Sequence, residues 1–415
     1  MYHLYYVLPI ICLASYTFNE ICLTPILVTI VEADTSHIDK DVALFTVKAS
    51  IYVGSILGYI CTAFWVPVIG FKAYAVITTI LSIISSLIVL IVQNDVRVLT
   101  VARFFSGLAS TSLLSQVWLQ FLTNGNRYES VKVQTYFNLT YYISYIVGML
   151  CSGIASHYYT QDAWKITSIF SQFFFASVLM TTIFFHEPMR TSGIDSIRKL
   201  IRLPRSLKRM RLPSTLYIKT FNSTEHVVHQ KRYVETVIVL LFCELTNGFS
   251  EGLFYVVLTI VLKTLYNFSD LFISITFIFI AVVSCVSNII IVPRVSSLFI
   301  AQVSTLLSIL FVIMGLVLKV SDITLILSFA LVKIIEQIVF TQVRVVEQGF
   351  FTGKLYYMAM FMSMYQIGTV LGVISSVYTP SGSIYVLAAM YFVNALLFIT
   401  FRQFLIYETT STGTL

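Results

Sequence analysis

Apolar residues along the chain fall into twelve long runs, separated by shorter polar stretches. A helix needs about 20 residues to cross the hydrocarbon core of a membrane, and every run is at least about that long. Polar and apolar residues do not alternate within the runs, so the pattern favours helices over membrane β-strands. The sequence therefore predicts twelve membrane-spanning helices, near residues 4–31, 43–69, 72–93, 97–123, 132–157, 164–186, 233–263, 268–292, 296–319, 322–348, 355–379 and 382–405.

The composition supports an integral membrane protein. Of the 415 residues, 58% are hydrophobic and only 11% are charged, whereas a soluble protein carries roughly 25% charged residues. So few charged groups cannot cover a surface that faces water, which argues against soluble and nucleic-acid-binding proteins. The fold class predicted from the chain is an all-α integral membrane protein with two six-helix halves.

One long polar stretch, residues 187–232, separates the sixth run from the seventh. It holds eleven Lys or Arg and three acidic residues, so its positive charge exceeds the +7 of the whole chain. By the positive-inside rule this stretch is cytoplasmic, and six spans on either side place both termini there too, with the plasma membrane as the expected membrane. We therefore divide the chain into an N-terminal six-helix bundle (1–186), a basic cytoplasmic loop (187–232), a C-terminal six-helix bundle (233–407) and a short cytoplasmic tail (408–415).

Ionisable residues inside the apolar runs are candidates for function, because a charge at bilayer depth is costly unless it faces the bundle interior or a wet cavity. Glu20 and Thr24 lie one helical turn apart in the first run. Glu244, Asn247 and Glu251 form one stripe in the seventh run, and Lys333 and Glu336 do so in the tenth. We expect a substrate-binding site made of Glu20, Thr24, Glu244, Asn247, Glu251, Lys333 and Glu336; buried ion pairs that lock the helices are the alternative.

Two further cations stand in the apolar runs. Arg103, in the fourth run, is predicted to form a structural ion pair. Lys48, near the start of the second run, is expected to extend its ammonium group to the membrane interface. The small-residue patterns Gly54–Gly58 and Gly368–Gly372 predict close helix packing.

The chain shows no sign of an enzyme. The six histidines lie at the ends of the runs or between them, which argues against a metal site, and there is no phosphate-binding P-loop. We therefore predict no catalytic residue, no metal and no cofactor.

Several short strings resemble known transporters. Residues 103–107 (RFFSG) and 148–153 (GMLCSG) resemble the fourth and fifth spans of the major facilitator superfamily. A narrower resemblance is to the reduced folate carrier and thiamine transporter family, whose first span carries a glutamate followed by Leu-Thr-Pro. Residues 19–27 (NEICLTPIL) are similar to that motif, and Lys333 matches a lysine in the tenth span of the family.

This resemblance implies a secondary transporter that moves a vitamin, thiamine or folate, by alternating access. Glu20 would lie in the vitamin site, and Lys333 would face the substrate. The chain differs at Leu113, where the family carries a polar residue. The expected partners are a small vitamin-like solute, the lipid bilayer and a coupling proton or anion, with no nucleic acid. A major facilitator-type transporter of another solute and a non-transporting receptor on the same fold are the alternatives.

Overall fold

The computed structural model describes residues 4–26, 39–91, 95–116, 127–159, 163–184, 223–260, 262–263, 267–290, 322–350, 355–378 and 385–397, with a few isolated positions besides. Its main helices are α1 (Leu4–Ile21), α3 (Lys40–Ile69), α4 (Phe71–Ile91), α5 (Val96–Leu108), α7 (Arg127–Tyr158), α8 (Ala163–Phe184), α11 (Ser223–Ile260), α12 (Asp270–Ile290), α14 (Asp322–Phe350) and α15 (Leu355–Tyr378).

The all-helical fold predicted from the sequence is confirmed. Every main element in the described part of the chain is a helix, and seven helices there are long and apolar enough to cross a membrane. The expected ninth span (296–319) lies almost wholly outside the described residues. The expected twelfth span (382–405) is represented by the shorter apolar helix Tyr385–Leu397.

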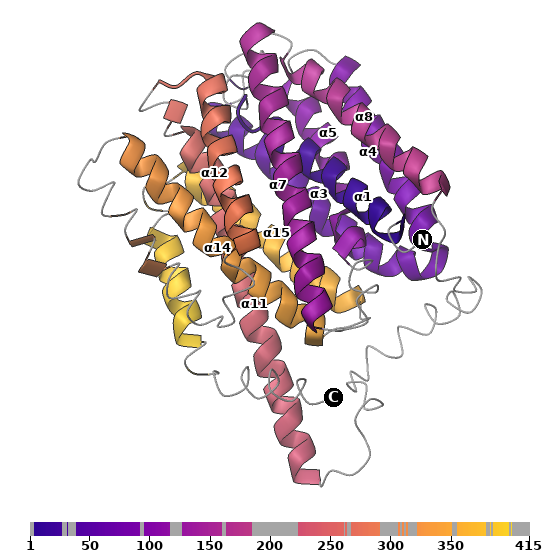
Figure 1. Ribbon diagram of the computed structural model, residues 1–415, viewed down its shortest axis with the longest axis vertical. Helices are drawn as coiled ribbons and strands as arrows, with labels where there is room; N and C mark the ends of the chain where they lie inside the picture. Colours follow the sequence, from indigo (N-terminus) through magenta and orange to yellow (C-terminus); the bar gives the residue numbers. More distant parts are fainter. Residues whose placement is uncertain are drawn as a thin grey trace.

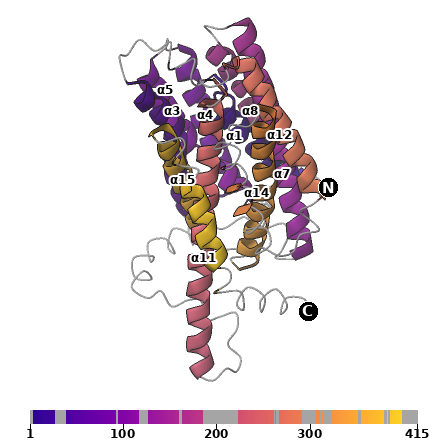
Figure 2. The ribbon, with the colours of Figure 1, turned by 90° about the vertical axis from the view of Figure 1, so that its left-hand side faces the viewer.

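The helices form two groups that follow the order of the sequence. In Figure 1, α1, α3, α4, α5 and α8 gather on one side of the bundle, and α11, α12 and α14 gather on the other. The groups meet where α7 packs along α12 and where α3 packs along α15, and Figure 2 shows α3 and α15 side by side. The groups therefore join along two seams.

Within each group, glycines bring two helix backbones into contact. A Cβ atom at Gly54 of α3 would overlap the carbonyl oxygen of Phe104 in α5. A Cβ atom at Gly368 of α15 would likewise overlap the carbonyl oxygen of Leu245 in α11. Both small-residue patterns therefore serve close helix packing, as the sequence predicts.

The boundary of the basic loop differs from its predicted position. Helix α11 begins at Ser223, so residues 223–232 are helical and continue into the seventh span. These residues include no proline or glycine that would end a helix. Figure 1 shows this end of α11 projecting beyond the other helices. Residues 185–222 and the predicted tail 408–415 lie outside the described residues.

The two ends of the bundle differ in their packing. We call the end at which α11 finishes, at Ile260, the far end, and the end from which α11 projects the near end. Toward the far end, two apolar clusters fill the space between the helices. They include Leu258 of α11 and Ile273 of α12 in one cluster, and Leu99 of α5 and Val373 of α15 in the other. The far end is therefore closed by packed side chains.

Candidate functional site

A cavity of about 750 Å³ lies between the two helix groups, on the near side of the packed far end. Helices α1, α3 and α7 line it from the first group, and α11, α14 and α15 line it from the second. Carboxylate, amide, phenol and guanidinium groups all contribute to its surface. The lining residues are Leu13, Tyr16, Thr17, Glu20, Tyr59, Ser112, Gln116, Phe137, Asn138, Tyr141, Asn247, Glu251, Glu336, Phe340, Arg344, Met362, Tyr365 and Gln366.

Four of the seven predicted site residues line this cavity. They come from three helices that lie far apart in the sequence: α1, α11 and α14. Lys333, Glu244 and Thr24 are buried but are not part of the lining. Lys333 and Glu244 each contact a lining residue directly. The four lining residues are Glu20, Asn247, Glu251 and Glu336.

Lys333 joins two of the lining carboxylates in a cluster, which we call the Lys333 cluster. Its Nζ atom lies 2.7 Å from Oε2 of Glu251 on α11 and 2.8 Å from Oε2 of Glu336 on α14. The other oxygen of each carboxylate accepts a phenol hydrogen bond, from Tyr141 at 3.1 Å and from Tyr391 at 3.0 Å. Each carboxylate oxygen therefore has a phenol or the Lys333 ammonium beside it, and of the four only Oε2 of Glu336 lacks a hydrogen bond to a described residue.

A second cluster, which we call the Arg344 cluster, lies on the same two helices but closer to the near end of the bundle. Arg344 of α14 lies 2.6 Å from Glu244 of α11 and 3.2 Å from Glu347, and none of the three side chains is exposed. The sequence reasoning missed Arg344 and Glu347. A signal was present: Arg344 and Glu347 repeat the spacing of Lys333 and Glu336 after 11 residues, or about three helical turns.

Glu20 of α1 differs from the other cavity carboxylates. Among the described residues, no Lys, Arg or His nitrogen lies within 4.0 Å of its carboxylate. Lys48 is only 2% exposed, so the expectation that it reaches the membrane interface is wrong. Its ammonium group donates to the Thr24 hydroxyl at 2.8 Å and lies 5.4 Å from the centre of the Tyr255 ring. Hydroxyl and aromatic groups are thus the direct partners of this cation, and the carboxylates of Glu20 and Glu251 attract it from a greater distance.

The structure places Thr24 differently from the prediction. Helix α1 ends at Ile21, so Thr24 lies in the following turn rather than on the helical face of Glu20. Pro25 accounts for the early end, because a proline disfavours the helical conformation of the residue before it. The Thr24 hydroxyl binds Lys48 and does not line the cavity.

Arg103 of α5 has partners other than the predicted carboxylate. Its guanidinium donates to the backbone carbonyl of Asn19 at 2.5 Å and to that of Glu20 at 2.9 Å. The last carbonyls of a helix lack intrahelical donors and attract cations. Because α1 ends at Ile21, its free carbonyls provide the site that Arg103 caps. This corrects the predicted ion pair.

Several polar atoms at the cavity wall have no hydrogen-bond partner. Both amide atoms of Asn247 are buried and unpartnered in the described part of the chain. The same holds for Oγ1 of Thr17 and for Oε1 of Gln116 and of Gln366. A buried polar atom without a partner costs about 1–3 kcal/mol. A polar molecule in the cavity would satisfy these groups.

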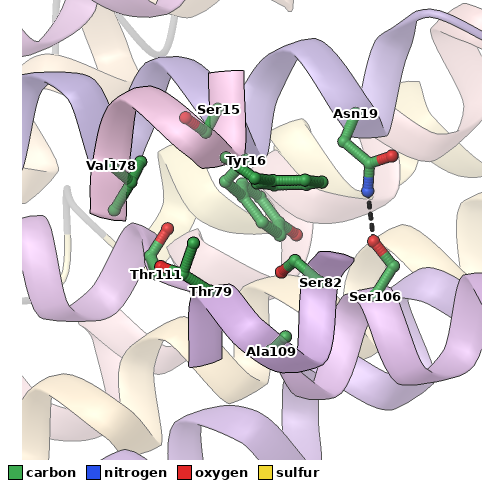
Figure 3. Close-up of a pocket in the computed structure, with 10 residues that line it drawn as sticks. Ser15, Tyr16, Asn19, Thr79, Ser82, Ser106, Ala109, Thr111 and Val178 are labelled. Carbon is green, nitrogen blue, oxygen red and sulfur yellow. Dashed lines mark hydrogen bonds between the residues drawn. The ribbon is translucent and has the colours of Figure 1, made fainter. Parts of the chain in front are cut away.

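A second, smaller pocket of about 260 Å³ lies within the first helix group, among α1, α4, α5 and α8. Figure 3 shows the Asn19 amide donating to the Ser106 hydroxyl at its wall. Thr79 and Thr111 donate to the helix carbonyls of Ala75 and Cys12, and the Tyr16 hydroxyl pairs with that of Ser55. Because these donors are already used, the larger cavity is the better candidate site.

The geometry suits the binding of a polar molecule. No three His, Cys, Asp or Glu residues gather as a metal site in the part of the chain that the structure describes. A helical membrane bundle that encloses a polar cavity between two groups of helices is the architecture of a membrane transporter.

The chain belongs to the Major Facilitator Superfamily, whose sequence model matches residues 10–373. This family and this fold are those of multi-pass membrane transporters rather than of enzymes. A search of curated proteins finds no match.

Solved transporters have the same fold. The human organic anion transporter MFSD10 (TETRAN) aligns with a TM-score of 0.69 and 13% identity, covering 95% of this chain and 99% of that one. The proton:xylose symporter XylE bound to a deoxyglucose derivative aligns with a TM-score of 0.72 and 11% identity, covering 96% of this chain and 95% of that one. A partially occluded inward-open form of XylE from E. coli aligns with a TM-score of 0.71 and 11% identity, covering 96% of this chain and 97% of that one. At these identities the likeness concerns the fold alone.

Proposed function

We propose that this chain is a secondary transporter that carries a small organic solute by alternating access between the halves 1–186 and 233–407. The solute would occupy the cavity between the two helix groups. The observation that carries the proposal is the set of buried, unpartnered polar atoms at the cavity wall, with Asn247 foremost. A bound solute would supply the hydrogen bonds that these atoms lack.

The charges at the cavity favour a solute with a positive charge. Three carboxylates line the cavity, against one guanidinium, that of Arg344. Arg344 is already matched by two carboxylates, whereas Glu20 has no ion-pair partner among the described residues. A cationic solute would offset the charge of Glu20, and an anion would meet repulsion there.

Among vitamins, these charges favour thiamine, which is a cation, over folate, which is an anion. The resemblance of residues 19–27 to the first span of the reduced folate and thiamine carriers supports a vitamin as the solute. Glu20 would contact the positive group of the solute. Asn247, Glu251 and Glu336 would form the opposite wall of the site, with Lys333 behind them.

We further propose that the basic segment 187–232 faces the cytoplasm of a cell whose plasma membrane holds the protein. Its positive charge supports this orientation. Both termini would then be cytoplasmic. The cavity lies toward the near end, so the structure would correspond to a state with its site toward the cytoplasm.

The test is uptake of labelled thiamine and labelled folate by transport-deficient cells that express the full chain. We expect thiamine uptake to exceed folate uptake. Glu20→Gln should lower thiamine uptake at least about tenfold at an unchanged surface level, because it removes a charge-assisted contact worth about 1.5–3 kcal/mol. Asp95→Asn is the matched control: it makes the same change at the N-cap of α5, where Asn also caps well.

No uptake of either vitamin, at wild-type surface levels, would contradict the vitamin proposal. Uptake of folate without thiamine would contradict the charge argument. Equal uptake by Glu20→Gln and the wild type would remove Glu20 from the site.

A further inference from the structure

The two buried charge clusters repeat one arrangement on one pair of helices. In each, a cation on α14 contacts a glutamate of α11 and a second glutamate three residues further along α14. Lys333 and Arg344 are 11 residues apart, about three turns, so they lie on one face of α14. Glu251 and Glu244 are two turns apart on α11. The clusters are therefore stacked along the bundle.

Each cluster sets two carboxylates against one cation. If all three groups are ionised, each cluster carries one uncompensated negative charge. The side chains of the Lys333 cluster are 3–8% exposed, and those of the Arg344 cluster are fully buried. An uncompensated charge in such surroundings costs several kcal/mol. Each cluster therefore needs a further source of compensation.

The Lys333 cluster has two hydrogen-bond donors that supply such compensation, whereas the Arg344 cluster leaves two carboxylate oxygens without a donor among the described residues. Phenol hydroxyls of Tyr141 and Tyr391 donate to the free oxygens of Glu251 and Glu336. In the Arg344 cluster, Oε1 of Glu244, Oε1 of Glu347 and Nε of Arg344 have no hydrogen-bond partner among the described residues. Oε2 of Glu336 also lacks a hydrogen bond to a described residue, but it lies 2.8 Å from the Lys333 ammonium. Every carboxylate oxygen of the Lys333 cluster thus has a phenol or the ammonium beside it. In the Arg344 cluster, the guanidinium contacts only Oε2 of each glutamate, and Oε1 is left without a hydrogen-bond partner in the described part of the chain.

The groups around the Arg344 cluster do not correct its charge. The Arg344 guanidinium lies 5.0 Å from the centre of the Phe340 ring and 5.8 Å from that of Tyr365 on α15. On α3, Tyr59 accepts a hydrogen bond from Gln366. On α11, Asn247 is neutral, and Cys243 contacts the neutral side chain of Asn394. None of these described neighbours is a cation.

We propose that the Arg344 cluster is a proton-binding site that holds one proton, on either Glu244 or Glu347. A hydronium ion would transfer its proton to a carboxylate oxygen, forming the O–H bond and leaving water. Arg344 lines the cavity, which provides the route for this transfer. With the proton bound, one carboxylate and one guanidinium remain, and the cluster is neutral. Two carboxylates at one site commonly share a single proton in this way. A role of this proton in solute coupling rests on the proposed function; its binding does not.

The test needs no substrate. Infrared difference spectra of the full chain in lipid nanodiscs, recorded over a pH series, detect the carbonyl stretch of a protonated carboxyl group. We expect the wild type to show such a band at neutral pH and to lose it as the pH rises. Glu244→Gln and Glu347→Gln should each lose this band, because one carboxylate on one guanidinium needs no proton.

Two control variants separate this band from other carboxyl groups. Glu336→Gln makes the same change at the equivalent position of the Lys333 cluster, and Glu20→Gln removes the unpaired cavity carboxylate. Both should keep the band that depends on Glu244 and Glu347. If the spectra of Glu244→Gln and Glu347→Gln match the wild type, both carboxylates are ionised and the proposal fails.

Thermal unfolding gives a second measurement. Gln is a neutral mimic of a protonated glutamate, so one of the two variants, Glu244→Gln or Glu347→Gln, should keep the wild-type midpoint at neutral pH. Glu336→Gln should lower it, because it breaks an ionised contact with Lys333. If Glu244→Gln and Glu347→Gln both lower the midpoint of thermal unfolding as much as Glu336→Gln does, the proposal is overturned. These measurements can succeed even if no vitamin is transported.

Discussion

The two halves of the molecule hold their buried cations in opposite ways. In the second half, Lys333 and Arg344 each contact two carboxylates. In the first half, Arg103 binds backbone carbonyls, and Lys48 binds a hydroxyl group and aromatic rings. Glu20, the cavity carboxylate of the first half, therefore has no ion pair within 4.0 Å among the described residues, and Lys48 and Arg103 act on it only from a greater distance. The comparison suggests that charges lock helices together in the second half, whereas in the first half they leave a carboxylate available to a ligand.

The largest effect should come from removing the cation of the Arg344 cluster. Arg344→Ala leaves the buried carboxyl groups of Glu244 and Glu347, of which at least one is ionised, without a cation, which should lower the free energy of unfolding by about 3–5 kcal/mol. Thermal unfolding of the purified protein measures this. The double variant Arg344→Ala with Glu347→Gln should recover part of the loss. A midpoint equal to that of the wild type would show that the cluster does not hold α11 and α14 together.

A smaller effect should follow from the equivalent change in the first half. Arg103→Ala removes two charge-assisted hydrogen bonds to the end of α1 but leaves no unpaired carboxylate, so we expect a loss of about 2 kcal/mol. Arg103→Lys should restore part of it, because an ammonium group can still bind a carbonyl. If Arg103→Ala costs as much as Arg344→Ala, the contrast between the halves does not hold.

The smallest effect on stability should come from Glu20. Glu20→Gln removes a charge that no described cation contacts, so the free energy of unfolding should change by no more than about 1 kcal/mol. The same unfolding measurement tests this, with Glu251→Gln as the paired comparison. A loss as large as that of Glu251→Gln would mean that Glu20 is held in an ion pair.

Much of the fold could be predicted from the sequence, because long apolar runs and the basic segment 187–232 reflect the membrane directly. The stripes that contain Glu251 and Lys333 could be found for a related reason: charged residues in apolar runs are conspicuous. Arg344 and Glu347 were missed although they stand in the same run. Recognising them required comparison with the spacing of Lys333 and Glu336 three turns earlier.

The errors at Thr24 and Arg103 share a physical cause, because both depend on where α1 ends. Pro25 ends the helix early, and this moves Thr24 out of the helical stripe. The same ending exposes the backbone carbonyls that bind Arg103. A sequence displays side chains but not free carbonyls, so a partner of this kind could not be read from it. Lys48 was misplaced for another reason: its direct partners inside the bundle are a hydroxyl group and aromatic rings, and no single carboxylate in its own run marked it as buried.

The glycine contacts described above have a consequence for movement. Between α3 and α5 and between α11 and α15, glycines let the two backbones touch, and an added Cβ there would overlap the neighbouring backbone. We therefore expect each pair to move as a rigid unit during transport. The displacement would then fall at the seam between α3 and α15, where Gln366 donates to Tyr59 across the two pairs. On this view, the glycines hold the helices of each pair together, and the larger side chains between α3 and α15 form the surface along which the two pairs move.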